Sequence, residues 1–338
     1  MTFDLRIVIP LALSFFVVLL VIPTWIKKAK SIGLIWEDVN KFRKVYAAGS
    51  GGLIVLLGFV IGVLFYIAYR VFLLNTENHF LIEIFALLTV VLMLGGIGLI
   101  DDLLGWRQGG LRRRTRILLV AVSSIPLIAI NAGKSVVGLP FIGNTDLGIF
   151  YPFLVIPIGI IGSVTTFNFL AGFNGEEAGQ VIIILTALAI VSYLTGSPWL
   201  TVVALCMIFA LCGFLFFNYN PAKIFPGDAL TYSVGGLIAI MAIMGNFEKI
   251  AVFFFIPYII ETVLKSRGKL IKQSFGKPDN KGNLNLKYDK IYSLNHVAIW
   301  LLNKTKLKAN EEKVTIFIWT FQIIIILIGF FIFRRGIF

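Results

Sequence analysis

Two adjacent carboxylates follow a long apolar run of the chain. Asp101 and Asp102 come directly after the glycine-rich residues 94–100. Carboxylates beside so apolar a segment are costly to desolvate, and the helix macrodipole disfavours acids at the C-terminal end of a helix. Neighbouring side chains on a helix diverge by about 100°, so one acid can face a metal ion while the other faces a basic residue. We therefore favour a chemical role over a solvated helix end.

A second polar cluster occupies residues 168–179. It contains Asn168 and Asn174, followed by Gly175 and Glu176, and it holds three glycines in all. Glycine permits tight turns and lets the backbone approach a ligand closely. Taken alone, this segment could equally be an ordinary loop.

Asp228 ends a third motif, Phe-Pro-Gly-Asp, at the start of another apolar run. An acid at that position could be a helix cap, which is worth about 1 kcal/mol. It could instead join the acid pair and Asn168 as a ligand of Mg²⁺, which prefers oxygen and typically takes one or two carboxylates plus substrate phosphates. The residues alone leave both interpretations open.

Basic side chains follow the acid pair closely, at Arg112, Arg113, Arg114 and Arg116. Guanidinium groups bind phosphate well, so these arginines could hold a phosphorylated substrate. Anionic lipid headgroups are a strong alternative partner for the first three.

The elements that position these residues must be membrane helices. Hydrophobic residues make up 58% of the 338-residue chain and charged residues only 14%, whereas a soluble domain carries roughly 25% charged residues. The apolar runs are continuous and approach the roughly 20 residues that cross a bilayer as a helix, without the alternation of a membrane barrel. Cys206 and Cys212 both lie inside an apolar segment, which argues against a disulfide framework and a metal cluster.

We predict an all-α polytopic membrane protein that forms a single domain over residues 1–338. About ten transmembrane helices are expected, at residues 5–23, 51–69, 83–100, 117–133, 152–169, 179–196, 199–217, 229–245, 249–264 and 315–333. The segments that meet on one face are then residues 24–50, 101–116, 170–178, 218–228 and 265–314. The last of these is the largest, and residues 279–288 within it suggest a small β-hairpin.

Charge assigns the sides of the membrane. Those five segments hold 24 of the 30 Lys and Arg residues, so the positive-inside rule makes them cytoplasmic and places both termini outside. Arg334 and Arg335 count weakly against this orientation. Basic residues arranged along one membrane face do not suggest nucleic acid as a partner, despite the net charge of +13. The connections on the opposite face, such as residues 196–198, are too short to build a site, so the chemistry is expected on the cytoplasmic side.

The acid pair, the Asn-Gly-Glu loop and the Phe-Pro-Gly-Asp motif, in this order and spacing, resemble the polyprenyl-phosphate N-acetylhexosamine-1-phosphate transferases. Residues 38–41 and 51–52 are also similar to that family, so the resemblance covers nearly the whole chain. The branch with the most similar form of residues 170–179 comprises the archaeal and eukaryotic dolichyl-phosphate GlcNAc-1-phosphate transferases. The resemblance implies a ten-span fold, dependence on Mg²⁺ (with Mn²⁺ as a substitute) and a UDP-sugar donor.

The same resemblance implies roles for individual residues. It makes Asn168 and Asp228 metal ligands, places Asn174 near the uracil and Gly175 and Glu176 in the donor site, and makes Asp101 and Asp102 catalytic acids. Lys41 and Arg116 match basic residues on the phosphate side. The last cytoplasmic loop departs from the family pattern, because it has one histidine, His296, and offers Arg267 and Lys277 instead as candidate contacts for the donor diphosphate.

The predicted reaction transfers GlcNAc-1-phosphate from UDP-GlcNAc to a membrane polyprenyl (dolichyl) phosphate and releases UMP, the first step of lipid-linked glycan assembly. One alternative is a bacterial-type transferase that uses another UDP-sugar. A polyprenyl-diphosphate phosphatase would release inorganic phosphate instead of UMP. A transporter or flippase would carry polar residues near the bilayer midplane, whereas the acids here gather at span ends. The sequence does not decide whether the protein forms a homodimer.

Overall fold

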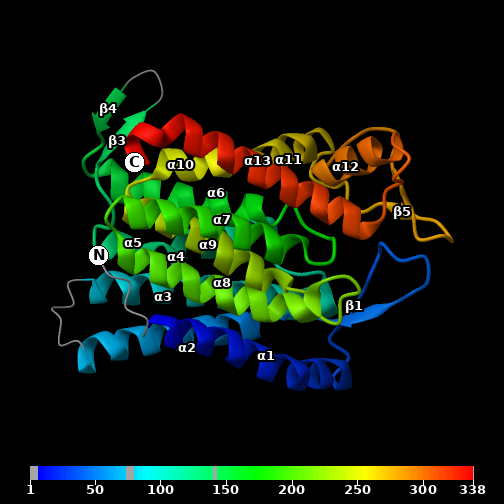
Figure 1. Cartoon of the computed structure of the whole chain (residues 1–338), viewed down its shortest axis with the longest axis horizontal. Coiled ribbons are helices and arrows are strands. Elements are labelled where there is room, and N and C mark those ends of the chain that lie inside the picture. Colours follow the sequence, from blue (N-terminus) through cyan, green and yellow to red (C-terminus); the bar gives the residue numbers. More distant parts are fainter. Residues whose placement is uncertain (1–6, 74–79, 140–142, 338) are drawn as a thin grey trace.

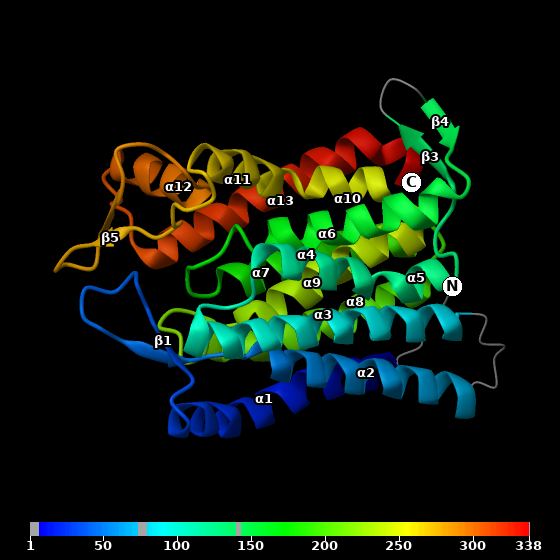
Figure 2. The same ribbon diagram turned by 180° about the vertical axis from the view of Figure 1, so that it is seen from behind.

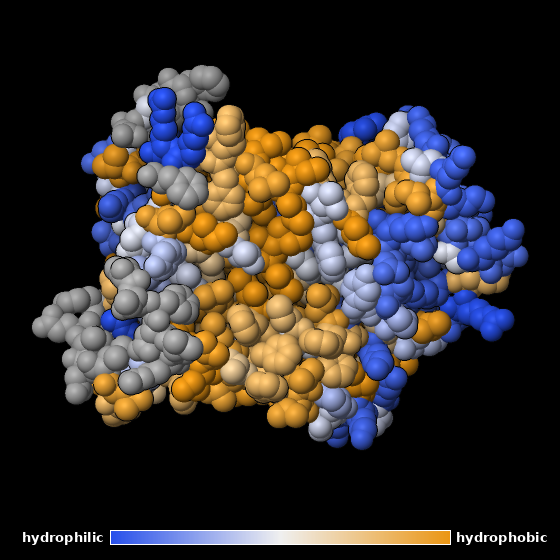
Figure 3. Space-filling view, in the orientation of Figure 1, coloured by the Kyte–Doolittle hydropathy of each residue, from blue (hydrophilic) through white to orange (hydrophobic). Residues whose placement is uncertain are grey.

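The computed structural model describes residues 7–73, 80–139 and 143–337. Seven helices in this part of the chain are long and apolar enough to cross a membrane. They are α1 (Val8–Ser31), α2 (Gly52–Phe72), α3 (Leu81–Gln108), α7 (Glu176–Leu194), α8 (Pro198–Asn218), α9 (Gly227–Gly245) and α13 (Glu311–Ile337). They run side by side along the long axis of the molecule (Figure 1). On the face shown in Figure 3, apolar residues cover the middle of the bundle and hydrophilic residues are concentrated at its two ends. The predicted all-α polytopic membrane fold is confirmed.

The other three predicted spans each fall on two shorter helical segments that follow one another. They are α4 (Arg113–Ser123) with α5 (Ile125–Ala129), the π-turn η2 (Tyr151–Val155) with α6 (Ile156–Phe167), and α10 (Glu248–Phe254) with α11 (Ile256–Arg267). Proline is the second residue of each following helix, at Pro126, Pro157 and Pro257. Proline has no backbone N–H and interrupts the helical hydrogen bonds, so the hydropathy marks each span correctly but not its break.

The described residues also form three small hairpins. The predicted hairpin is present but shorter than expected: β5 (Lys277–Pro278) pairs with β6 (Leu284–Asn285) in antiparallel register. The Asp279 carboxylate accepts from the backbone N–H groups of Lys281 and Asn283, both at 2.8 Å, and closes its turn. Two further hairpins were not predicted, β1 (Ile35–Glu37) with β2 (Tyr46–Ala48) and β3 (Val136–Leu139) with β4 (Gly143–Asp146).

The two ends of the bundle differ. The β1–β2 and β5–β6 hairpins and α12 (Leu294–Asn303) lie at one end, which we call the loop end, whereas β3–β4 and the C-terminal end of α13 lie at the other (Figures 1 and 2). The first and last residues, and with them the predicted side of both termini and the beginning of the first span at residue 5, lie outside the described residues.

Helix α9 is the centre of the bundle and contacts α2, α3, α6, α7 and α10. Its contact with α3 is close where α9 begins, because a Cβ on Gly98 would lie 2.2 Å from the carbonyl oxygen of Asp228. Only glycine allows this approach. The last turns of α3, which carry the acid pair, therefore lie against the first turn of α9.

The two ends of the bundle should lie on opposite sides of the membrane. In a cysteine-free background, we expect a cysteine at Lys281 and a cysteine at Thr195 to be labelled by an impermeant maleimide from opposite sides of sealed vesicles. Both positions are exposed, so the label can reach them. Labelling of both cysteines from the same side would contradict the expectation that the bundle crosses the membrane.

Candidate active site

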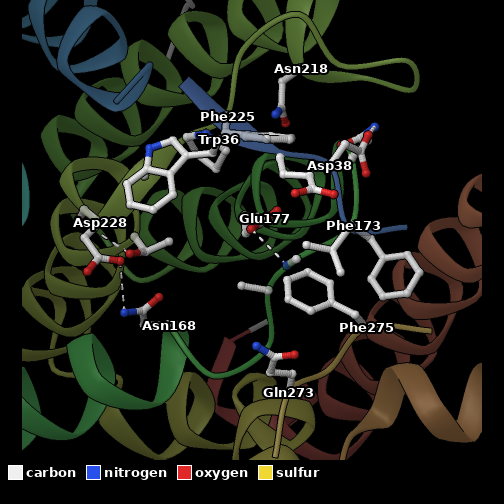
Figure 4. A pocket seen from close by; sticks show the side chains of 18 residues that line it. Trp36, Asp38, Asn168, Phe173, Glu177, Asn218, Phe225, Asp228, Gln273 and Phe275 are labelled. Carbon is white, nitrogen blue, oxygen red and sulfur yellow. Dashed lines mark hydrogen bonds between the residues drawn. The ribbon is translucent and has the colours of Figure 1, made fainter. Parts of the chain in front are cut away.

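A cavity of about 430 Å³ opens at the loop end of the bundle. Its walls come from segments far apart in the sequence, as Figure 4 shows with Trp36, Asp38, Asn168, Phe225 and Phe275 around one space. A second cavity of about 410 Å³ adjoins it and contains the acid pair and Arg116. Asp228 lines both cavities. The structure thus brings together the three polar clusters that lie far apart in the sequence.

Asp102 holds the beginning of α9. Its Oδ1 accepts from the backbone N–H of Asp228 at 2.7 Å and its Oδ2 from that of Ala229 at 3.4 Å. These N–H groups belong to the first turn of the helix and have no partner within it, so a carboxylate from α3 caps α9 from outside. Gly227 makes room for it, because a Cβ there would lie 2.2 Å from Asp102 Oδ2 and the residue has a φ of +71°.

The Asp228 side chain does not cap its own helix. The cap interpretation of this residue is therefore wrong, because Asp102 already occupies the N–H groups that a cap would bind. Instead, Asp228 Oδ1 accepts from Asn168 Nδ2 at 3.1 Å. The two predicted metal ligands are thus in contact, from the start of α9 and the end of α6.

Asp101 accepts three hydrogen bonds from three residues and forms an ion pair with one of them. Its Oδ1 accepts from the Leu111 N–H at 2.7 Å and from Arg116 Nη2 at 3.0 Å, and its Oδ2 accepts from the Tyr232 hydroxyl at 3.0 Å. Arg116 Nε lies 2.5 Å from the same Oδ2. The carboxylate is 2% exposed, so its charge is balanced almost entirely by Arg116. Asp101 is therefore arranged to hold an arginine, whereas Asp102 keeps room for further partners at the cavity wall.

Within the described residues, no three His, Cys, Asp or Glu side chains form a ready-made metal cluster. Asp228 and Asn168 offer one carboxylate and one amide. Mg²⁺ is commonly bound by one or two carboxylates with substrate phosphates and water completing its octahedron. A two-residue oxygen site beside a nucleotide-sized cavity fits that requirement.

Neighbouring side chains of the loop 168–177 lie in different surroundings. Asn174 lines the large cavity, and its Nδ2 donates to Asp38 Oδ2 at 2.9 Å. Gly175 precedes α7 with a φ of +79°. Glu176, expected in the donor site, is fully buried and accepts from Asn295 of α12 at 3.1 Å. This placement corrects the prediction, because Glu177, one residue on, lines the cavity instead.

Lys41 lies in a partly buried set of contacts between the first and last parts of the chain. Its ammonium group bonds Asn220 Oδ1 at 2.5 Å and forms an ion pair with Glu311. Glu311 Oε1 also accepts from the Asn174 N–H at 3.0 Å. We call Lys41, Asn174, Asn220 and Glu311 the clasp. It fixes the loop that carries Asn174 against the N-terminal end of α13.

The last loop contributes differently from what the sequence suggested. Arg267 and Lys277 are exposed and do not line the large cavity, whereas Gln273 and Phe275 do. His296 is buried, and its Nδ1 accepts from the Tyr292 N–H at 3.2 Å. Burial lowers the pKa of His296 to about 4, so it is a neutral structural group.

Sequence reasoning missed the aromatic walls and two positioning groups, Tyr232 and Glu311. One signal was available for Tyr232: it follows Asp228 by four residues and so shares its face of the helix. Glu311 begins the last span and carries no local sign of its contact with Lys41.

The fold and the site define a polytopic membrane protein with an acid-lined, nucleotide-sized cavity at one end. The glycosyl transferase family 4 model matches residues 84–246. A protein of Saccharolobus solfataricus, provisionally named UDP-N-acetylglucosamine–dolichyl-phosphate N-acetylglucosaminephosphotransferase, is 32% identical over 96% of this chain and 96% of its own. A protein of Sulfolobus acidocaldarius with the same provisional name is 32% identical over 91% of both chains. A phospho-N-acetylmuramoyl-pentapeptide-transferase of Staphylococcus epidermidis is 28% identical over 76% of this chain and 80% of its own. The chain belongs to glycosyl transferase family 4.

The clasp gives a stability prediction. Replacing Glu311 by Ala removes the acceptor of the Asn174 N–H and the nearer carboxylate of Lys41, which keeps Asp38 at 3.8 Å and Asn220. Removing one partner of a buried ion pair costs about 3–5 kcal/mol, and we expect somewhat less because Lys41 is partly exposed. The midpoint of thermal unfolding in detergent should fall by several degrees.

The matched control is Glu312→Ala. Glu312 is one residue further along and bonds the Tyr219 hydroxyl at 2.9 Å in an exposed contact, which contributes little. Equal unfolding midpoints for the two variants would show that the clasp does not stabilise the fold.

Proposed function

We propose that this protein transfers GlcNAc-1-phosphate from UDP-GlcNAc to a membrane polyprenyl phosphate, giving polyprenyl-diphosphate-GlcNAc and UMP. The observation that carries the proposal is the contact of Asp228 with Asn168 at the junction of two cavities, beside Arg116. The provisional names of two relatives that match over more than nine-tenths of the chain support the same reaction.

The large cavity suits the donor. Small-molecule sites typically enclose about 300–1,000 Å³, and this one holds about 430 Å³. Trp36, Phe225 and Phe275 give it flat apolar walls on which a nucleobase can stack. Asn174 and Asp38 offer polar edges to the base or ribose, and Asp228 lies at the inner end where the diphosphate would reach.

A lateral cavity of about 330 Å³ suits the acceptor. Its walls combine Ile117, Val120 and Val164 with Arg116 and Asn168. Ile117 is half exposed on α4, so an isoprenoid chain can enter the cavity from the bilayer. Its phosphate would then meet Arg116, at the point where the lateral cavity approaches the acid pair.

Asp228 and Asn168 would hold Mg²⁺, which when bound neutralises the diphosphate and the charge that develops during phosphoryl transfer. The chain's own groups orient the reactants. An acceptor phosphate oxygen forms a bond to the sugar-bearing phosphorus of the donor, and the bond from that phosphorus to the bridging oxygen of UMP breaks. Arg116 positions the acceptor phosphate, and Asp102, less occupied than Asp101, takes its last proton.

The rival functions fit less well. A transporter needs its polar groups near the middle of the membrane, whereas these acids and amides lie at the loop end of the bundle. A phosphatase would need no cavity of nucleotide size. The excess of Lys and Arg at the loop end supports a cytoplasmic site, to which a soluble nucleotide sugar has access.

Asp228→Asn separates a metal role from a structural one. Asp102 caps the helix, so the variant should keep its fold and its thermal unfolding midpoint. Loss of several kcal/mol of metal-centred stabilisation corresponds to a rate about three orders of magnitude lower. UMP release should fall by about that factor, and the activity that remains should require a higher Mg²⁺ concentration. A rate above about a tenth of wild type would remove Asp228 from the proposed metal site.

The donor sugar gives an independent prediction. With purified protein, Mg²⁺ and dolichyl phosphate, labelled UDP-GlcNAc should yield a lipid-linked product and UMP. UDP-MurNAc-pentapeptide should react far more slowly, because the two archaeal relatives with dolichyl-phosphate names match at 32% identity over more than nine-tenths of the chain and the last loop has a single, buried histidine. Comparable transfer of the two sugars, measured by chromatography of the lipid product, would favour the bacterial-type alternative.

A further inference from the structure

Tyr232 occupies a position that the proposed reaction has not used. It lies one helical turn after Asp228, on the same face of α9, and is 3% exposed. Residues four apart on a helix stack along one face. Asp228 therefore faces the large cavity proposed for the donor, and Tyr232 lines the lateral cavity one turn deeper in the bundle.

The Tyr232 hydroxyl acts on Asp101 and not directly on the arginine. It donates to Asp101 Oδ2 at 3.0 Å, the same oxygen that lies 2.5 Å from Arg116 Nε. Together with the Leu111 N–H on the other oxygen, it fixes the plane of the carboxylate. A guanidinium bound by two of its nitrogens to a fixed carboxylate has a fixed direction for its remaining N–H groups.

Arg116 lies where two cavities meet. Arg116 lines both the acid-containing cavity and the lateral cavity. Small errors in the placement of a phosphate-binding group weaken both binding and alignment. On the basis of the proposed function, we propose that Tyr232 is a positioning residue for the acceptor phosphate, acting through Asp101 on Arg116.

The test is Tyr232→Phe, which removes one hydroxyl and keeps the ring. A hydrogen bond to a charged group is worth enough to change affinity by about tenfold or more. We expect the KM for polyprenyl phosphate to rise about tenfold, with the KM for UDP-GlcNAc changed less than about twofold. The increase in thermal unfolding midpoint on adding polyprenyl phosphate should shrink in parallel, which measures acceptor binding without turnover.

The chain offers a matched control in Tyr151→Phe. Tyr151 is also buried, and its hydroxyl donates to a carboxylate, Glu248 Oε1, at 2.5 Å, but at the opposite end of the bundle. It lacks the contact with the acid pair. Its KM values and acceptor-induced stabilisation should equal those of wild type, although its unfolding midpoint can fall as much as that of Tyr232→Phe.

A double-mutant cycle tests the route. If Tyr232 acts through Asp101, Tyr232→Phe should change the acceptor KM much less in an Asp101→Asn background than in wild type. Equal acceptor-induced stabilisation in wild type and Tyr232→Phe, or a rise of both KM values together, would overturn the positioning role. Absence of UMP release from the wild-type enzyme would instead overturn the proposed function, so the two failures are distinguishable.

Discussion

The cap that Asp102 provides to α9 is the contact on which the rest of the site depends. It joins the end of one membrane helix to the beginning of another through two backbone N–H groups. Because the capping carboxylate comes from outside the helix, the side chain of Asp228 is released from that task and can face the cavities. Gly98 and Gly227 allow the necessary approach, and a Cβ at either would collide with the partner segment. This one structural contact thus leaves the Asp228 carboxylate available to Asn168 and to the cavities, at a place where a helix would ordinarily use it as a cap.

Most of the fold could be predicted because membrane helices need long apolar runs. All ten predicted spans fall on helical segments, and the motifs at their ends meet at one end of the bundle. The breaks at Pro126, Pro157 and Pro257 were not predicted, because proline within a span can bend a helix without ending it. The first two hairpins were missed because their strands have three or four residues each, too few for a period to be recognised.

The site was predicted less evenly. The acids and Asn168 were found because charged and amide groups beside apolar runs need a reason to be there. Glu176 and Glu177 could not be separated, since adjacent helical residues differ by about 100° in direction and hydropathy says nothing about which one faces a cavity. Arg267 and Lys277 were chosen by charge, yet the last loop lines the large cavity with Gln273 and Phe275. Long-range pairs such as Lys41 with Glu311 have no local signature.

The clasp also sets an order of events during synthesis. Glu311 lies at the beginning of the last membrane helix, 270 residues after the Lys41 that it holds. Until that helix has left the ribosome and entered the bilayer, the loop that carries Asn174 lacks the partner that fixes it. Before α13 has inserted, the acids can already assemble, but the loop that carries Asn174 is not yet held by Glu311. The cavity is therefore complete only once α13 has joined the bundle.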